Sequence, residues 1–242
     1  MNNKIDRRRH YLLTVDIETA NHAEDAIAYD IGFAVVDKHG NVYEKYSFMV
    51  AEMFLERRYN DMMKTAYYAE KLPNYWADYR VGARKLARIL TIRKVVREVM
   101  KKYNIVDVYA YNANFDKTGL DRSVRYLTKS AVRYFFPFNT NIHCIWHMAT
   151  QTICQQKRYF KTALKNNWVS ENGNLQTSAE RVFAYISKNA DFSESHTGLE
   201  DVLIETQILA KCYAQHKKML TNIYRRCWVL PQKSFKEFAV NA

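Results

Sequence analysis

Residues 11–20 read YLLTVDIETA, a run in which apolar and β-branched side chains surround two acids. The pattern predicts a β-strand over residues 11–17. Because alternate residues of a strand face the same side, Asp16 and Glu18 project together while Ile17 projects into the core. Neighbouring carboxylates repel each other, and a hard cation such as Mg²⁺ or Mn²⁺ relieves that repulsion. A D-x-E pattern is also common on solvated strand faces, so by itself it does not establish a metal site.

A second group of polar residues, YNANFD, occupies residues 111–116. It follows a strand expected over residues 106–110 and opens a helix expected over residues 114–129. Asn114 is a favourable N-cap, which places Asp116 in the first helical turn, near the positive end of the helix dipole. Ligands of open α/β sheets bind at this carboxyl edge of the strands. A plain capping acid is the alternative interpretation of Asp116.

A third group, HTGLED, begins at His196. Thr197 and Glu200 have the spacing of a capping box, which predicts that a helix starts at Gly198. Asp201 then lies in the first turn, with His196 in the loop just before the cap. One helix end therefore delivers a carboxylate and an imidazole to nearby points, although a single loop histidine is more often an ordinary surface residue.

The three groups follow one another as D-x-E, then N-x-x-F-D about a hundred residues later, then H-x-x-x-x-D near the end. In this order they resemble the DEDD (DnaQ-like) 3′–5′ exonuclease superfamily, in its histidine-bearing (DEDDh) branch. The resemblance covers roughly residues 10–50 and 92–215. Five residues match the three exonuclease motifs position by position: Asp16, Glu18, Asp116, His196 and Asp201.

The resemblance implies an RNase H-like fold, with a five-stranded mixed sheet flanked by helices, and removal of nucleotides from a 3′ end. Asp16 would bridge two Mg²⁺ (or Mn²⁺) ions, Glu18 and Asp201 would complete the tighter site, and Asp116 would hold the second ion. His196 would be the general base. From its position in a loop, we hypothesise in addition that His196 swings in when substrate binds. Residues beside the motifs are expected to contact substrate: Thr19, Asn112 and Phe115.

The chain pattern by itself also predicts an α/β fold with a mixed sheet, because three strands come first and helices then alternate with strands. Strands are expected at residues 11–17, 31–37, 42–50, 106–110 and 142–145. Helices are expected at residues 92–103, with a break near Thr91, at 114–129 and from 198 onward. We expect one domain over residues 1–242, with an insertion at about 52–90 and a C-terminal helical extension at about 212–242. Residues 155–195 show no interpretable motif.

The insertion alternates aromatic and basic residues, among them Tyr75, Trp76 and Arg80. Bases stack on aromatic rings while arginines contact phosphates, so these three residues are candidates for gripping a single strand. The alternative is an aromatic core beneath a helical insertion. The sequence leaves both interpretations open.

The composition narrows the function classes. The formal net charge of +12 favours a polyanionic partner such as nucleic acid. The closest two of the six glycines, Gly32 and Gly40, are eight positions apart. This spacing is too wide for either the G-x-G-x-x-G motif or the P-loop motif, so both are excluded. Four cysteines without a C-x-x-C pair fit a reducing compartment, and Cys144 and His147 are expected in the core. With no membrane-length apolar run and no targeting segment, we expect a cytoplasmic protein of bacterial or phage type.

Three functional hypotheses remain at this point. The first is an exonuclease that acts on single-stranded DNA or mismatched 3′ ends and serves proofreading or repair. For proofreading, it would need a separate polymerase or replication partner. The second is an exoribonuclease, because discrimination of the 2′-OH depends on contacts outside the five motif residues. The third is a catalytically silent nucleic-acid-binding module, which the presence of all four carboxylates disfavours.

Overall fold

The computed structural model describes residues 5–21, 23–129, 131 and 133–241, and within them six strands form one mixed sheet in the order β4-β3-β2-β1-β5-β6. Their bounds are β1 Leu12–Ala20, β2 Ile27–Val36, β3 Val42–Val50, β4 Lys85–Ala87, β5 Asp107–Ala110 and β6 Asn141–Cys144. Strands β1, β2 and β3 pair antiparallel, whereas β5 joins β1, β6 joins β5 and β4 joins β3 in parallel. The expected α/β class and mixed sheet are confirmed.

The expected strand count of five is wrong by one. The additional strand, β4, has three residues and lies at the edge of the sheet beside β3. A strand this short carries too few residues for an alternating pattern, which is why the sequence did not indicate it. The expected start of β2 is also wrong, since the strand begins at Ile27 rather than at residue 31. Asp30 interrupts the apolar run of β2 and is itself fully buried within it.

The helices have the bounds α1 Ala51–Leu55, α2 Asn60–Met63, α3 Leu72–Arg80, α4 Ile89–Tyr103, α5 Ala113–Thr128, α6 Ile145–Gln151, α7 Lys157–Lys165, α8 Ala179–Ser187, α9 Gly198–Tyr213 and α10 Gln232–Val240. Short 3₁₀ turns lie at Ala23–Asp25, Arg57–Tyr59, Ala69–Lys71, Ile153–Gln155 and Cys227–Val229. The expected break near Thr91 is wrong, because α4 runs without interruption from Ile89.

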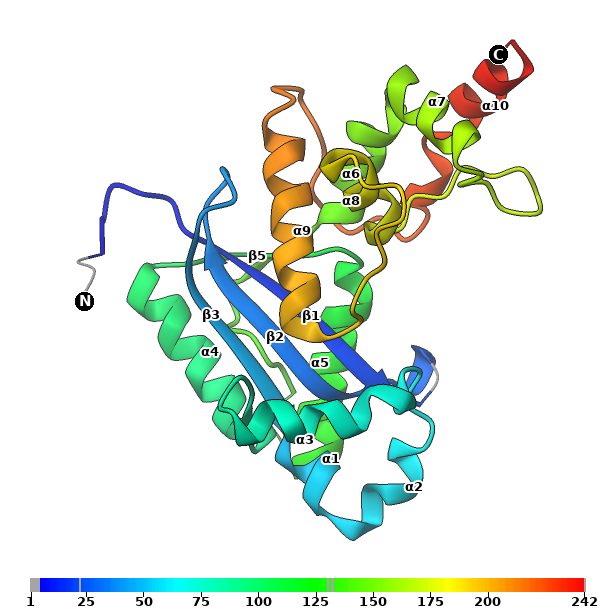
Figure 1. Ribbon diagram of the computed structural model, residues 1–242. Helices are drawn as coiled ribbons and strands as arrows, with labels where there is room; N and C mark the ends of the chain where they lie inside the picture. The colour runs from blue at the N-terminus through cyan, green and yellow to red at the C-terminus, as the bar shows by residue number, and fades with distance from the viewer. Residues whose placement is uncertain (1–4, 22, 130, 132, 242) are drawn as a thin grey trace.

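Helices cover both faces of the sheet (Figure 1). Alternate residues of β1 enter two separate cores, as the strand period requires. Leu13, Val15 and Ile17 pack with α4, α5 and the insertion, whereas Leu12 packs with α6–α10. Thr14 lies on the second face, where its hydroxyl is 3.0 Å from that of Thr206 in α9. The long helix α9 is therefore bound directly to the strand that carries the first motif.

The insertion is helical, as expected, and comprises α1, α2, α3 and β4. It lies below the foot of α9 in Figure 1. Tyr75 is 1% exposed, its ring packs against Tyr29 and Phe54, and its hydroxyl donates to Asp30. The aromatic-core interpretation therefore holds for Tyr75, and the expectation that this ring grips a strand is wrong, because a base cannot reach it.

After α9 the chain returns along α6 to α10, which packs against α7 through Phe235 and Phe160. Cys144 and His147 are buried, as expected, and one imidazole nitrogen of His147 lies 2.8 Å from the Asn222 carbonyl oxygen. Among the described residues we find no helix with the length and hydrophobicity to span a membrane.

Candidate active site

Strand β1 holds the first two acids at the centre of the sheet. Asp16 pairs with Gly32 and Glu18 with Asp30 of β2, and a register shift follows Glu18. Both acids lie on the face opposite to Ile17, which is buried in the core. The strand period thus places the two carboxylates together, as the sequence predicts.

Helix α5 brings Asp116 to the same region. The helix starts at Ala113, one residue earlier than expected, so Asn112 rather than Asn114 occupies the N-cap position. The expectation that Asn114 caps the helix is therefore wrong. The Asn112 side chain makes no capping hydrogen bond either. Its backbone carbonyl accepts hydrogen bonds from the amides of Phe115 and Asp116. Asp116 nevertheless lies in the first turn and is buried, as expected.

Helix α9 reaches the site through a close backbone contact. It starts at Gly198, as predicted, and Gly198 lies against Gly32. A Cβ at Gly32 would come within 2.2 Å of the Gly198 carbonyl carbon, and a Cβ at Gly198 would come within 3.2 Å of the Asp16 carbonyl oxygen. Only glycine fits at this crossing. The contact brings Asp201, in the first turn of α9, beside the acids of β1.

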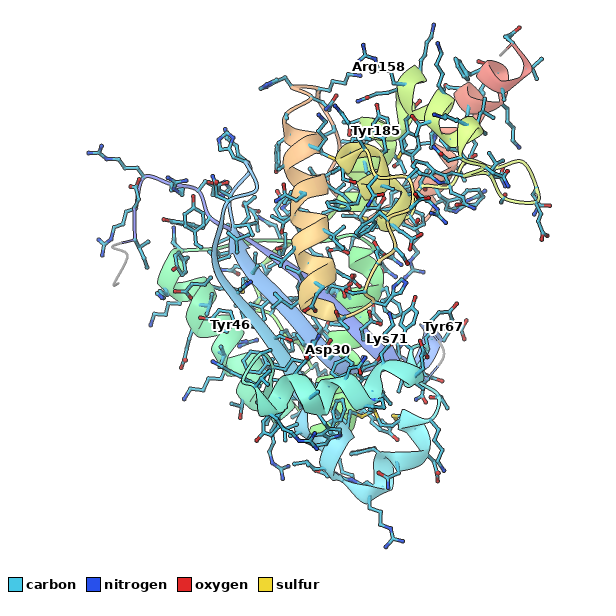
Figure 2. The ribbon with its side chains drawn as sticks, in the orientation of Figure 1. Asp30, Tyr46, Tyr67, Lys71, Arg158 and Tyr185 are labelled. Atoms are coloured by element: carbon cyan, nitrogen blue, oxygen red, sulfur yellow. The ribbon has the colours of Figure 1, made fainter. Side chains whose placement is uncertain are left out.

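The first amide of α9 is capped from the sheet. Gly198 donates its N–H to Asp30 Oδ2 at 2.9 Å. The expected capping box is wrong: the Thr197 hydroxyl donates to the Glu200 carboxylate at 2.5 Å, and no backbone amide bonds to the Thr197 side chain. A buried carboxylate at a helix N-terminus is favoured by the helix dipole. Figure 2 shows Asp30 at the foot of α9.

Arg84 of the insertion neutralises Asp30. Its guanidinium donates to Asp30 at 3.0 Å, and the same group also pairs with Asp78 and Glu200. The Asp30 and Arg84 side chains are 0% and 3% exposed, so this ion pair is fully desolvated. Burial raises the pKa of Asp30, and Arg84 opposes that rise. The sequence analysis assigned no role to Asp30 or to Arg84.

The four motif carboxylates repel one another in a buried setting. Burial and repulsion from Glu205, Asp116, Glu18 and Asp201 raise the pKa of Asp16 well above its usual value. Burial likewise raises the pKa of Glu18 to about 9, of Asp116 to about 8 and of Asp201 to about 7. Carboxylates forced together in this way gain most from a bound cation.

Orphaned oxygens show where a cation would fit. Asp16 Oδ2 and Asp201 Oδ1 are buried without a hydrogen-bond partner. One ligand atom each from Glu18, His196 and Asp201 lies within 4.8 Å of the others. Carboxylate oxygens are the ligands that Mg²⁺ and Mn²⁺ prefer, so the donor set fits a divalent cation.

His196 lies beside the carboxylates. Its backbone is left-handed, with φ of 51°, and its ring stacks on Tyr68 with centroids 4.1 Å apart and planes 9° apart. The ring lies beside Glu18 and Asp201, and the hypothesis that His196 waits on a mobile loop and swings in with substrate stays a prediction. Burial and the nearby Lys71 lower the pKa of His196.

Three acids near the site were not singled out from the sequence. Glu205, one turn after Asp201 on α9, is buried and accepts a hydrogen bond from the Tyr111 amide at 3.2 Å. Glu194 and Glu180 come from the segment that showed no motif, and each offers a carboxylate within 4.8 Å of a ring nitrogen of His196. Glu205 could have been found from its i, i+4 spacing to Asp201, which places both side chains on one face of the helix. No local sequence pattern marks Glu194 or Glu180.

The expected substrate contacts are placed differently from one another. Thr19 is buried, Phe115 is half-buried, and Asn112 is exposed at the start of α5. In the insertion, Trp76 is half-buried against Phe54, whereas Arg80 is exposed. Substrate contacts by Thr19, Asn112, Phe115, Trp76 and Arg80 remain predictions.

We compared the sequence and the structure with those of known proteins. No family model matches this sequence, and no curated protein matches it by sequence. The structure, however, is similar to solved structures of E. coli exonuclease I. The fold is RNase H-like. The structure of exonuclease I with a 5cy-dT13 oligonucleotide gives a TM-score of 0.53 at 13% identity, covering 91% of this chain and 42% of exonuclease I.

Two further exonuclease I structures agree with this comparison. The complex with a dA16 oligonucleotide gives a TM-score of 0.51 at 13% identity, covering 83% of this chain and 40% of the other. The product-bound structure gives 0.51 at 13% identity, covering 91% and 45%. The chain thus spans less than half the length of exonuclease I.

Proposed function

We propose that this protein is a metal-dependent 3′–5′ exonuclease that releases nucleotides from single-stranded or mismatched DNA ends. The observation that carries the proposal is the cluster of Glu18, His196 and Asp201, whose ligand atoms lie within 4.8 Å of one another. Asp16 and Asp116 lie near enough for their charges to interact with this cluster, and one buried carboxylate oxygen each of Asp16 and Asp201 has no hydrogen-bond partner. This set matches the motif order of the DEDDh exonucleases. The oligonucleotides in the exonuclease I complexes are DNA, which favours DNA over RNA for the substrate.

The carboxylates Asp16, Glu18, Asp116 and Asp201 would hold two Mg²⁺ or Mn²⁺ ions. Such a pair supplies Lewis-acid stabilisation of the attacking and leaving oxygens in phosphodiester hydrolysis. Partial burial of the four groups lowers the local dielectric constant, which strengthens their electrostatic interactions. The net charge of +12 attracts the phosphate backbone toward this acidic pocket.

His196 is the proposed general base. A general base must be unprotonated to accept the proton of the attacking water. Burial lowers the pKa of His196, which favours the neutral imidazole that this role requires. Its ring lies beside Glu18 and Asp201, within reach of the proposed metal site.

The test is a digestion assay on 5′-labelled single-stranded DNA, duplex DNA and RNA, with Mg²⁺ or Mn²⁺ and then with EDTA. We expect a ladder of shortened DNA products that disappears with EDTA and with Asp16→Asn. Asp61→Asn, which removes an exposed acid paired with Lys64, is the matched control and should leave the ladder unchanged. No digestion of any strand with either metal contradicts the proposal, and preferential digestion of RNA replaces the DNA assignment with the exoribonuclease alternative.

A further inference from the structure

Two side chains of the insertion, Tyr68 and Lys71, contact the segment that contains His196. Tyr68 stacks face to face on the imidazole, with ring centroids 4.1 Å apart. Lys71, one turn later, donates to the carbonyl of Ser195, the residue before His196. The Lys71 ammonium also lies over the Tyr68 ring, 5.0 Å from its centroid. Figure 2 shows Lys71 beside the foot of α9.

A carboxyl group lies near the edge of the imidazole, beside the face that is stacked. Its Nδ1 lies 3.8 Å from Glu194 Oε2, and the side chain is 27% exposed. An aromatic stack restricts rotation of both rings. A histidine in a loop would otherwise sample several side-chain rotamers.

The same contacts adjoin the metal-binding carboxylates. Burial, followed by repulsion from Glu18, raises the pKa of Tyr68. The His196 ring on which Tyr68 stacks has a nitrogen within 4.8 Å of carboxylate oxygens of Glu18 and Asp201. The two insertion residues thus lie where they can act on both the base and the acids.

We propose that Tyr68 and Lys71 are positioning residues that hold the His196 imidazole in the orientation required for proton transfer. The inference rests on the proposed nuclease function. The insertion, with Tyr75 and Arg84 in its buried half, is anchored to Asp30 of the sheet, so Tyr68 and Lys71 project from a fixed support. A misplacement of a catalytic group by about 1 Å costs about 100-fold in rate, so a loss of this stack should lower kcat strongly.

The test compares Tyr68→Leu, which removes the stack, with Tyr68→Phe, which retains it. Tyr68→Leu should lower kcat about 10- to 100-fold on single-stranded DNA with KM changed less than about threefold, whereas Tyr68→Phe should keep kcat within about twofold. Lys71→Met is the second variant, with an intermediate loss of kcat expected. Tyr79→Leu, a partly exposed tyrosine of the same insertion, is the control.

A second measurement does not depend on activity. The ring protons of His196, assigned with His196→Gln, should move downfield in Tyr68→Leu but not in Tyr68→Phe, since only the former loses the stacked ring. Equal kcat in Tyr68→Leu and wild type overturns the inference while leaving the proposed function intact. A wild type that digests no strand defeats the proposed function, and an unmoved His196 resonance in Tyr68→Leu overturns the positioning contact itself.

Discussion

Gly198 of α9 lies directly against Gly32 of β2, so closely that a Cβ on Gly32 would meet the backbone of both Gly198 and Leu199 within 2.3 Å. The contact joins the helix that carries Asp201 to the strand next to Asp16. Backbone atoms on both sides leave no flexible side chain that could move aside. The distance between Asp201 and Asp16 therefore depends on glycine, which has no side chain, at both Gly32 and Gly198.

Gly32→Ala should displace the start of α9 and abolish nuclease activity. Overpacking of this kind costs about 1–3 kcal/mol, and the displacement moves Asp201 away from Asp16. Urea unfolding and the digestion assay measure the two effects. Gly82→Ala is the control: a Cβ there meets open space, so only the strain of its positive φ, about 1 kcal/mol, is expected, with activity retained. Full activity in Gly32→Ala would show that the close contact is not needed.

Asp30→Ala should destabilise the protein by about 3–5 kcal/mol, because it leaves the Arg84 guanidinium buried without its principal partner. It also removes the cap of the Gly198 amide. Arg84→Met in the Asp30→Ala background should recover part of the loss. Urea denaturation of the two single variants and the double variant measures their coupling; simple additivity would mean that the two residues do not interact energetically.

His196→Ala should lower kcat about 10²- to 10⁴-fold, the usual contribution of a general base. Because the four carboxylates remain, the variant should still bind Mn²⁺, which calorimetry can verify. His39→Ala, at an exposed histidine of the β2–β3 turn, is the matched control. A His196→Ala variant with nearly normal kcat would remove this residue from the proposed mechanism.

The stability of the metal-free protein should fall as the pH rises. The pKa values of Glu18, Asp116 and Asp201 in the folded state are about 9, 8 and 7, above their values in the unfolded chain. The folded state then binds more protons, so stability present below about pH 4 is lost progressively up to about pH 9. Thermal unfolding in EDTA should show this decline, and added Mg²⁺ should raise Tm most at the alkaline end. A Tm in EDTA that is independent of pH would contradict the buried-carboxylate account.

Glu205→Gln should weaken Mn²⁺ binding about tenfold, the lower end of the effect of groups that support metal ligands. Glu205 lies close enough to Asp16 to raise its pKa, and glutamine retains an oxygen for the Tyr111 amide while losing the negative charge. Glu237→Gln, at an exposed position of α10, is the control for the loss of one negative charge. Isothermal titration calorimetry of the metal-free wild type and variants with Mn²⁺ measures these affinities. Equal affinities of wild type and Glu205→Gln would assign Glu205 a purely structural role.

Local pattern was enough to place the motif residues on their elements. Strand alternation put Asp16 and Glu18 on one face, and helix periodicity with its start signals located the first turns that hold Asp116 and Asp201. The same reasoning failed at Asn114 and Thr197, where capping depends on what lies across the helix end. It also failed at β4, whose three residues become a strand only because β3 offers them an edge.

The sequence by itself determined the order of the acidic motifs, which is read directly from the chain, and the α/β class, which follows from the order of the segments with strand and helix periods. Only the tertiary structure decided how α9 is capped, which acids besides the motif reach the site, and that Tyr68 stacks on His196. Asp30 and Gly198 are 168 positions apart, and their hydrogen bond forms only after the sheet and α9 have packed. Contacts of this kind depend on where the folded chain brings distant residues together, and short-range periodicity holds no information about that.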